Sequence, residues 1–169
     1  MEEKSYKEYL NHITTFIFDV DGVLTDATLH ITITGGLLRT MNVKDGFALK
    51  FAVNAGYNVA IISAGTNDGV KIRLEGLGIN TVHLGVHNKL EIYNDYILAN
   101  HIKPEHVLYM GDDIPDYQVM KLVGLPCCPQ DAVPEIKSVA KYISHKNGGH
   151  GAVREVIEQV LKVQGKWEF

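Results

Sequence analysis

Cysteine is scarce in this sequence of 169 residues, and the only two, Cys127 and Cys128, are adjacent. Adjacent cysteines suit neither a disulfide framework nor a CxxC metal or redox motif, so we expect reduced, structural thiols. The eight histidines are scattered without metal-ligand spacing, and we interpret all but His150 as structural or surface residues. Metal centres built from cysteine or histidine are therefore not predicted.

Long apolar runs and clusters of basic residues are also missing. No stretch approaches the roughly 20 apolar residues of a membrane span, and the charged start MEEKSYKEYLNHI lacks the apolar core of a signal peptide. Lys and Arg number 16 against 20 Asp and Glu, and no Lys/Arg run occurs that would favour nucleic-acid binding. We expect a cytoplasmic protein without membrane or nucleic-acid partners.

No Pro/Gly/Ser-rich linker, internal repeat or low-complexity segment divides the chain, so residues 1–169 are predicted to form one domain. Apolar runs alternate with amphipathic stretches, which indicates an α/β fold with a doubly wound, Rossmann-like parallel sheet. The predicted strands are 14–19, 58–63, 81–84, 106–111, 124–128 and 140–143. The predicted helices are 45–54, 67–77, 88–100, 114–122, 133–137 and 151–163.

One segment interrupts this alternation. The stretch TLHITITGGLLRTMNV, residues 28–43, carries alternating apolar positions around Gly35 and Gly36, which predicts a β-hairpin with a tight turn. It lies between the first strand and the first helix, and no linker sets it apart. We therefore expect a hairpin inserted into the one domain.

Acidic side chains gather at two of the predicted strand ends. The stretch FIFDVDGVLTD places Asp19 and Asp21 after the first strand, and GDDIPD places Asp112, Asp113 and Asp116 after the fourth. Ligands of open parallel sheets bind outside the carboxyl ends of the strands, at the topological switch point. The five carboxylates would share one crevice if these two strands are neighbours.

Such a crevice needs a counter-charge, because like charges about 4 Å apart repel by roughly 4 kcal/mol at an effective dielectric constant near 20. Oxygen ligands select a hard cation, and an incomplete cage with room for water and a phosphate oxygen favours Mg²⁺ over Ca²⁺. An EF-hand is a poor alternative, because DVDGVLTDATLH lacks the regular oxygen ligands and the closing Glu.

The order of these motifs resembles the haloacid dehalogenase (HAD) superfamily of phosphotransferases. Its four motifs match DVDGVLTD, Ser63 of IISAG, Lys89 of LGVHNKL, and GDDIPD. The resemblance implies that Asp19 is the nucleophile that forms an aspartyl-phosphate and that Asp21 is the general acid and base. It also implies that Ser63 and Lys89 hold the phosphoryl oxygens, and that Asp19, Asp112 and the backbone carbonyl of Asp21 coordinate Mg²⁺.

Other polar residues receive less specific predictions. We expect Asp113 and Asp116 to lie just outside the metal ligands, with Asp116 orienting either the metal site or Lys89. His150 stands in NGGHGAVREV, where glycine-rich backbone at a helix start suits an anion, although a simple loop-to-helix turn is the alternative. Asp26 and Asp45 are predicted to be caps or turn formers.

Many HAD phosphatases carry a cap domain, but neither the interval after the first motif nor that between Ser63 and Lys89 has room for one. Either a neighbouring subunit must then shield the site or the substrate is macromolecular. Over nearly its whole length, the chain resembles the capless sugar-acid phosphatases of the superfamily, through DVDGVLTD, the hairpin, NVKDGFALK, GDDIPDYQVM and GGHGAVREVIEQVL. Their typical substrate is 3-deoxy-D-manno-octulosonate 8-phosphate (KDO 8-phosphate).

This closer resemblance implies a homotetramer in which the hairpins associate and a neighbour's tail closes the active site. The tail QGKWEF, residues 164–169, is consistent with this assembly, because Trp167 and Phe169 follow no core periodicity and would contact another subunit. The alternative is a tail folded onto its own chain.

Two departures from the family pattern leave the substrate open. The second motif of the family usually continues into an Arg and its late loop reads Gly-Gly-Arg-Gly, whereas this chain has SAGT and GGHG. We expect Ser63, Ala64, Lys89 and His150 to contact the substrate, but the missing cations admit nine-carbon keto-deoxy sugar acid 9-phosphates as an alternative. Alternatives from another class are a phospho-acceptor signalling domain, which the acidic pair after Lys89 argues against, and a non-catalytic binding module.

Overall fold

The computed structural model describes residues 5–169, and at its centre lies a six-stranded sheet in the order β5-β4-β1-β6-β7-β8. Every neighbouring pair of these strands is parallel. The strands are β1 (Thr15–Phe18), β4 (Asn58–Ile62), β5 (Thr81–His83), β6 (Val107–Met110), β7 (Leu125–Cys128) and β8 (Tyr142–Ile143). The predicted doubly wound α/β fold is confirmed, and each strand lies within its predicted range.

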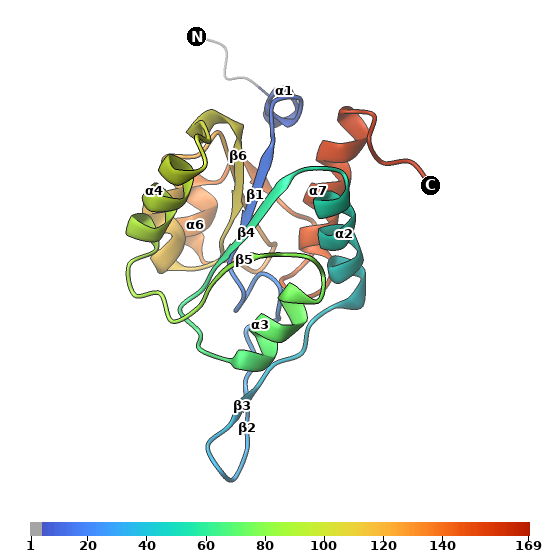
Figure 1. Cartoon of the computed structure of the whole chain (residues 1–169). Helices are drawn as coiled ribbons and strands as arrows, with labels where there is room; N and C mark the ends of the chain where they lie inside the picture. Colours follow the sequence, from blue (N-terminus) through green and yellow to red (C-terminus); the bar gives the residue numbers. More distant parts are fainter. Residues whose placement is uncertain (1–4) are drawn as a thin grey trace.

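Helices cover both faces of the sheet (Figure 1). Strand β1 shows why, because its side chains alternate: Phe16 and Phe18 belong to one buried apolar cluster, and Ile17 belongs to the other. The first cluster includes residues of α2 (Val43–Asn54), α3 (Asp68–Glu75) and α7 (Ala152–Val163). The second includes residues of α4 (Lys89–Ala99), α5 (Tyr117–Met120) and α6 (Pro134–Val139).

Four short helical segments differ from the predictions. The predicted helix 114–122 was wrong as one element, because it divides into the 3₁₀ turn η2 (Ile114–Asp116) and α5. Pro115 stands in the first turn of η2, where its missing N–H costs no hydrogen bond. Helix α1 (Tyr6–Leu10) and the 3₁₀ turn η1 (Pro104–His106) were not predicted. In residues 5–169, none of the helices has the length and apolar character that a membrane span requires.

The predicted hairpin projects from the carboxyl end of the sheet (Figure 1). Strands β2 (His30–Ile31) and β3 (Leu37–Leu38) pair antiparallel. Gly35, at a positive φ of 82°, donates to the carbonyl of Thr32 at 2.9 Å and closes the turn. Apolar side chains remain uncovered on this hairpin, with Ile31 75% and Ile33 105% exposed.

The carboxyl-terminal tail lies against its own chain in this structure. The Trp167 ring centroid is 4.8 Å from that of Phe51 and 6.3 Å from that of Phe47, both on α2. Figure 1 shows the chain end beside α2 and α7, away from the hairpin. Phe169 leaves 89% of its surface exposed. In the single chain the tail therefore folds onto its own subunit, which is the alternative to a contact with a neighbour.

Candidate active site

The two acidic strand ends meet because β1 and β6 are neighbours. Phe18 pairs with Met110 in the parallel register, and the Asp19 amide donates to the Met110 carbonyl at 3.1 Å. The expected adjacency of the first and fourth core strands is therefore confirmed. Beyond these ends lies a cavity of about 220 Å³, lined by Asp19, Asp21, Ala27, Ser63, Ala64, Gly65, Lys89, Asp112, Asp113 and Pro115.

Lys89 is the buried cation of this cavity. It begins α4 and is only 4% exposed, and its Nζ lies 2.6 Å from Asp19 Oδ2 and 2.8 Å from Asp116 Oδ1. Burial opposes its charge, but the carboxylates of Asp116 and Asp19 outweigh that effect and raise the pKa of Lys89. Lys89 therefore stays protonated between two carboxylates.

Asp116 is held by three donors and has no exposed surface. Its carboxylate accepts hydrogen bonds from the Tyr109 hydroxyl at 2.5 Å, from Lys89 Nζ at 2.8 Å and from the Asp112 amide at 3.2 Å. A Cβ at Gly111 would lie 2.4 Å from the Asp116 side chain, so only glycine leaves room for it. Asp116 thus orients Lys89 rather than facing the cavity. Orienting Lys89 is one of the two roles expected for it.

Asp112 has an unsatisfied carboxylate. Its Oδ1 is buried without a hydrogen-bond partner among the described residues. Burial, followed by the charges of Asp19 and Asp116, raises the pKa of Asp112 to about 8. Its other oxygen, Oδ2, lies beside the turn after β1, so close that a Cβ at Gly22 would be only 1.9 Å from it. Burial is also the main cause that raises the pKa of Asp19 to about 6.

This arrangement fits a hard cation. Oxygens of Asp19, Asp112 and Asp116 lie within 4.8 Å of one another. Among the described residues, Asp116 accepts from three donors, each Asp19 oxygen accepts from one, and Asp112 Oδ1 accepts from none. Asp19 and Asp112 therefore keep lone pairs that a metal ion could use. Two crowded carboxylates with raised pKa values are a donor set that an oxygen-seeking divalent ion neutralises.

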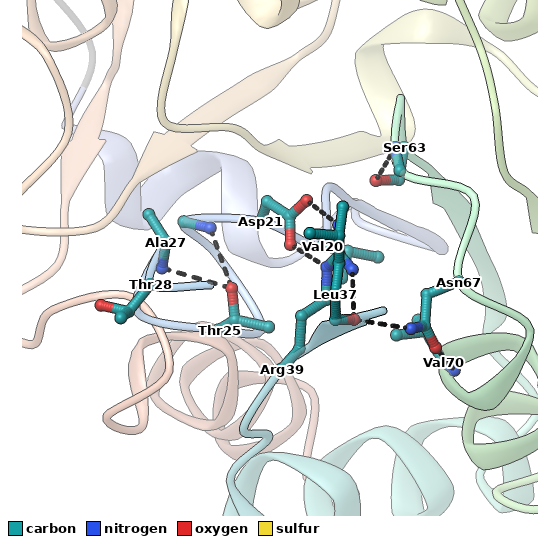
Figure 2. A network of polar contacts seen from close by, with 12 residues as sticks. Val20, Asp21, Thr25, Ala27, Thr28, Leu37, Arg39, Ser63, Asn67 and Val70 are labelled. Atoms are coloured by element: carbon teal, nitrogen blue, oxygen red, sulfur yellow. Dashed lines mark hydrogen bonds and ion pairs between the residues drawn. The ribbon is translucent and has the colours of Figure 1, made fainter. Parts of the chain in front are cut away.

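Asp21 faces a residue that was not predicted, Arg39 of the hairpin (Figure 2). Arg39 donates from Nε to Asp21 Oδ1 at 2.7 Å and from Nη2 to Oδ2 at 3.0 Å. The hydrogen bond to Asp21 raises the pKa of Arg39. The sequence carried no periodic signal for this contact, because the two residues meet only after the chain passes through the hairpin and returns.

Similarity to known proteins shows which family this chain belongs to. The sequence profile of the haloacid dehalogenase-like hydrolases matches residues 78–157. The 3-deoxy-D-manno-octulosonate 8-phosphate phosphatase of Salmonella typhi is 40% identical over 155 residues, covering 92% of this chain and 82% of that protein. The chain belongs to the haloacid dehalogenase-like hydrolases. Its phosphatase relatives match most of its length, so this HAD hydrolase is a phosphoric monoester hydrolase.

Solved structures agree with this assignment. The KDO 8-phosphate phosphatase of Yersinia pestis matches with a TM-score of 0.93 and 34% identity, over 96% of this chain and 88% of that one. The enzyme of Moraxella catarrhalis, solved with magnesium, phosphate and KDO, matches with a TM-score of 0.92 and 31% identity, over 96% and 93% of the two chains.

The remaining predicted site residues of this HAD hydrolase divide into two groups. Ser63, which is 1% exposed, and Ala64 line the cavity. Asp113 also borders it, but its Oδ1 accepts the Ile114 amide at 2.7 Å and so caps η2. His150 instead lines a different groove, along α7, and its Nδ1 lies 2.8 Å from the Gly148 carbonyl. The structure does not bring His150 to the cavity.

Two further aspartates accept hydrogen bonds from backbone amides. Asp26 accepts the Thr28 amide at 2.9 Å in a local turn, as predicted. Asp45 is buried and its Oδ1 accepts the Arg154 amide at 2.8 Å, in the first turn of α7. It is thus a cap of a helix far away in sequence, and not of α2, whose cap is Asn42.

Proposed function

We propose that this HAD hydrolase is a Mg²⁺-dependent phosphatase that converts KDO 8-phosphate to KDO and phosphate. The observation that carries the proposal is the buried Lys89 between Asp19 and Asp116, beside the unsatisfied Asp112. The substrate is suggested by the relatives named for it and by the Moraxella catarrhalis structure with magnesium, phosphate and KDO. The alternative of a non-catalytic binding module does not account for such a complete set of reactive groups.

The proposed chemistry has two steps. Asp19 attacks the phosphorus to form an aspartyl-phosphate, and the bond from phosphorus to the sugar oxygen breaks as Asp21 gives that oxygen a proton. Asp21, now a carboxylate, then takes a proton from water, whose oxygen attacks the aspartyl-phosphate. Phosphate leaves and the Asp19 carboxylate is restored.

Charge decides whether a phosphate dianion can enter this cavity. Lys89 Nζ, 2.6 Å from Asp19, offers a cation beside the attacking carboxylate, and Ser63 offers a hydroxyl. Asp19, Asp112 and the backbone carbonyl of Asp21 would hold Mg²⁺, which when bound supplies further neutralisation of the phosphoryl oxygens. Because phosphate monoesters hydrolyse so slowly in water, positioning and neutralisation must together lower the barrier by on the order of 20 kcal/mol.

A homotetramer is also proposed. The supporting observation is the projecting hairpin, whose exposed apolar side chains include Ile31, Ile33 and Leu38, and such a patch commonly marks a protein interface. We propose that the chain carries no cap domain of its own and that a neighbour's tail excludes water from the cavity. That role requires Trp167 and Phe169 to leave their place on α2.

The experiment that tests the substrate compares kcat/KM for KDO 8-phosphate with that for nine-carbon keto-deoxy sugar acid 9-phosphates, in the presence of Mg²⁺. Discrimination between substrates is measured by this ratio. We expect the eight-carbon substrate to be preferred. Preference for a nine-carbon substrate would retain the chemistry and overturn the proposed substrate.

A further inference from the structure

Tyr109 of β6 and Tyr93 of α4 are two fully buried tyrosines of the same apolar cluster. The Tyr109 hydroxyl donates a hydrogen bond to Asp116 Oδ1 at 2.5 Å. The Tyr93 hydroxyl is buried without a hydrogen-bond partner among the described residues. The two side chains therefore differ in one respect that bears on the active site, which is the contact of Tyr109 with the carboxylate that holds Lys89.

One oxygen of Asp116 is shared between Tyr109 and Lys89. Asp116 Oδ1 accepts from the Tyr109 hydroxyl and also from Lys89 Nζ, at 2.8 Å. The other oxygen, Oδ2, accepts from the Asp112 amide at 3.2 Å. Lys89 Nζ in turn lies 2.6 Å from Asp19 Oδ2, and both of these residues line the cavity. A hydroxyl and an ammonium group thus meet at the same oxygen, and the ammonium group contacts a second carboxylate as well.

The shared oxygen couples the Tyr109 hydroxyl to the position of Lys89. Hydrogen bonds in a buried network alter one another's strength. Two donors at one carboxylate oxygen share its negative charge, so each weakens the attraction for the other. Neither Tyr109 nor Asp116 has any exposed surface, so bulk water offers no replacement donor and the attraction is weakly screened. Without the hydroxyl, Asp116 Oδ1 would therefore attract Lys89 Nζ more strongly.

Lys89 is the partner that would move. The Asp116 side chain is packed against the backbone of Gly111, where a Cβ would lie 2.4 Å from it, and the Asp112 amide holds its second oxygen. Lys89 reaches the carboxylates through a flexible four-carbon stem. A stronger attraction to Asp116 therefore displaces Lys89 Nζ away from Asp19 and the cavity.

We propose that Tyr109 is a positioning residue whose hydroxyl sets how Lys89 is shared between Asp116 and the cavity. This inference rests on the proposed function, in which Lys89 holds a phosphoryl oxygen. By taking part of the Asp116 charge, the hydroxyl leaves the ammonium group beside Asp19, where the phosphoryl group binds. The described residues that line the cavity do not include Tyr109, so it acts on the substrate through Asp116 and Lys89.

The test measures the Kd of inorganic phosphate by isothermal titration calorimetry with Mg²⁺, and kcat/KM for KDO 8-phosphate, in wild type and Tyr109→Phe. Tyr109→Phe should raise the Kd about 3- to 10-fold and lower kcat/KM about 10-fold, as expected when a charged hydrogen bond is weakened but not lost. Incomplete folding would lower the number of binding sites but not their affinity, so a merely structural role of Tyr109 would leave the Kd unchanged.

The matched control is Tyr93→Phe, which removes an equally buried hydroxyl that has no hydrogen-bond partner among the described residues. It should change neither the Kd of phosphate nor kcat/KM. Circular dichroism melting curves verify that each variant is folded.

A second comparison sets Asp116→Asn beside the double variant Tyr109→Phe/Asp116→Asn. Without the negative charge of Asp116, the hydroxyl has no attraction for Lys89 to weaken, so the two variants should bind phosphate with the same Kd. This comparison decides the question even if Tyr109→Phe does not fold, because the double variant leaves no Asp116 carboxylate short of a donor.

The outcomes separate the inference from the proposed function. An unchanged Kd in Tyr109→Phe, an equal rise in Tyr93→Phe, or a further rise in the double variant would overturn the inference alone. Failure of wild type to bind phosphate or to hydrolyse KDO 8-phosphate would overturn the proposed function, and the inference with it.

Discussion

Replacing Asp112 by Asn should stabilise the metal-free protein, and more so at higher pH. The pKa of Asp112 is raised to about 8 from its ordinary value of 3.8, so the folded state binds its proton more tightly than the unfolded chain does. Stability is therefore lost as pH rises from about 4 to about 8. Asn has the same shape, fits against Gly22 as Asp112 does, and carries no charge to repel Asp19.

The magnitude follows from this difference in pKa. One pKa unit corresponds to about 1.4 kcal/mol, so the ionisation of Asp112 lowers the free energy of unfolding by about 4 kcal/mol between pH 5 and pH 8. Urea unfolding in EDTA measures it. Wild type should lose this stability relative to Asp112→Asn over that pH interval, and Mg²⁺ should restore it in wild type only.

The matched control is Asp113→Asn, next to it in sequence. Asp113 is exposed and caps η2 through the Ile114 amide, a bond that Asn retains, so the change should stay within about 0.5 kcal/mol. If Asp112→Asn were less stable than wild type by the same amount at both pH values, the ionised Asp112 carboxylate would not destabilise the metal-free fold. The argument for a cation site would then be refuted.

The remaining predictions concern Asp19, Lys89 and the tail. Asp19→Asn should abolish phosphate release while the far-ultraviolet circular dichroism stays unchanged, and retained turnover would move the nucleophile elsewhere. Lys89→Met should lower the free energy of unfolding by about 3–5 kcal/mol in urea, because it leaves two buried carboxylates without their cation. Its control, Lys71→Met, breaks a surface pair of 3.9 Å with Glu75 and should cost less than about 1 kcal/mol; similar losses would count against the buried pair. Removing residues 165–169 should reduce kcat/KM if a neighbour's tail closes the site, and unchanged kinetics would argue against that lid.

Most of the sheet was predictable because strand position and buried character are local properties. The apolar runs 14–19 and 106–111 end in acidic motifs, and a doubly wound sheet places those ends side by side, as the pairing of β1 with β6 confirms. The interval 114–122 was harder, because its apolar spacing suits a helix whereas Pro115 permits only a first turn there, so η2 precedes α5.

Contacts between distant segments were the part that the sequence did not reveal. Arg39 reaches Asp21 only because the hairpin folds back, and Tyr109, which donates to Asp116, looked like an ordinary core residue of β6. Asp45 was expected as a cap, but its partner, the Arg154 amide, lies at the other end of the chain. Each of these depends on tertiary packing, for which hydrophobic periodicity carries no signal.

Phosphate release from KDO 8-phosphate by the purified wild-type protein, followed with Mg²⁺, after EDTA, and after Mg²⁺ is restored, tests the central claim most directly. The account predicts rapid release that EDTA abolishes and Mg²⁺ recovers, because Asp19 and Asp112 crowd together without a cation. Release that continues undiminished in EDTA would contradict it.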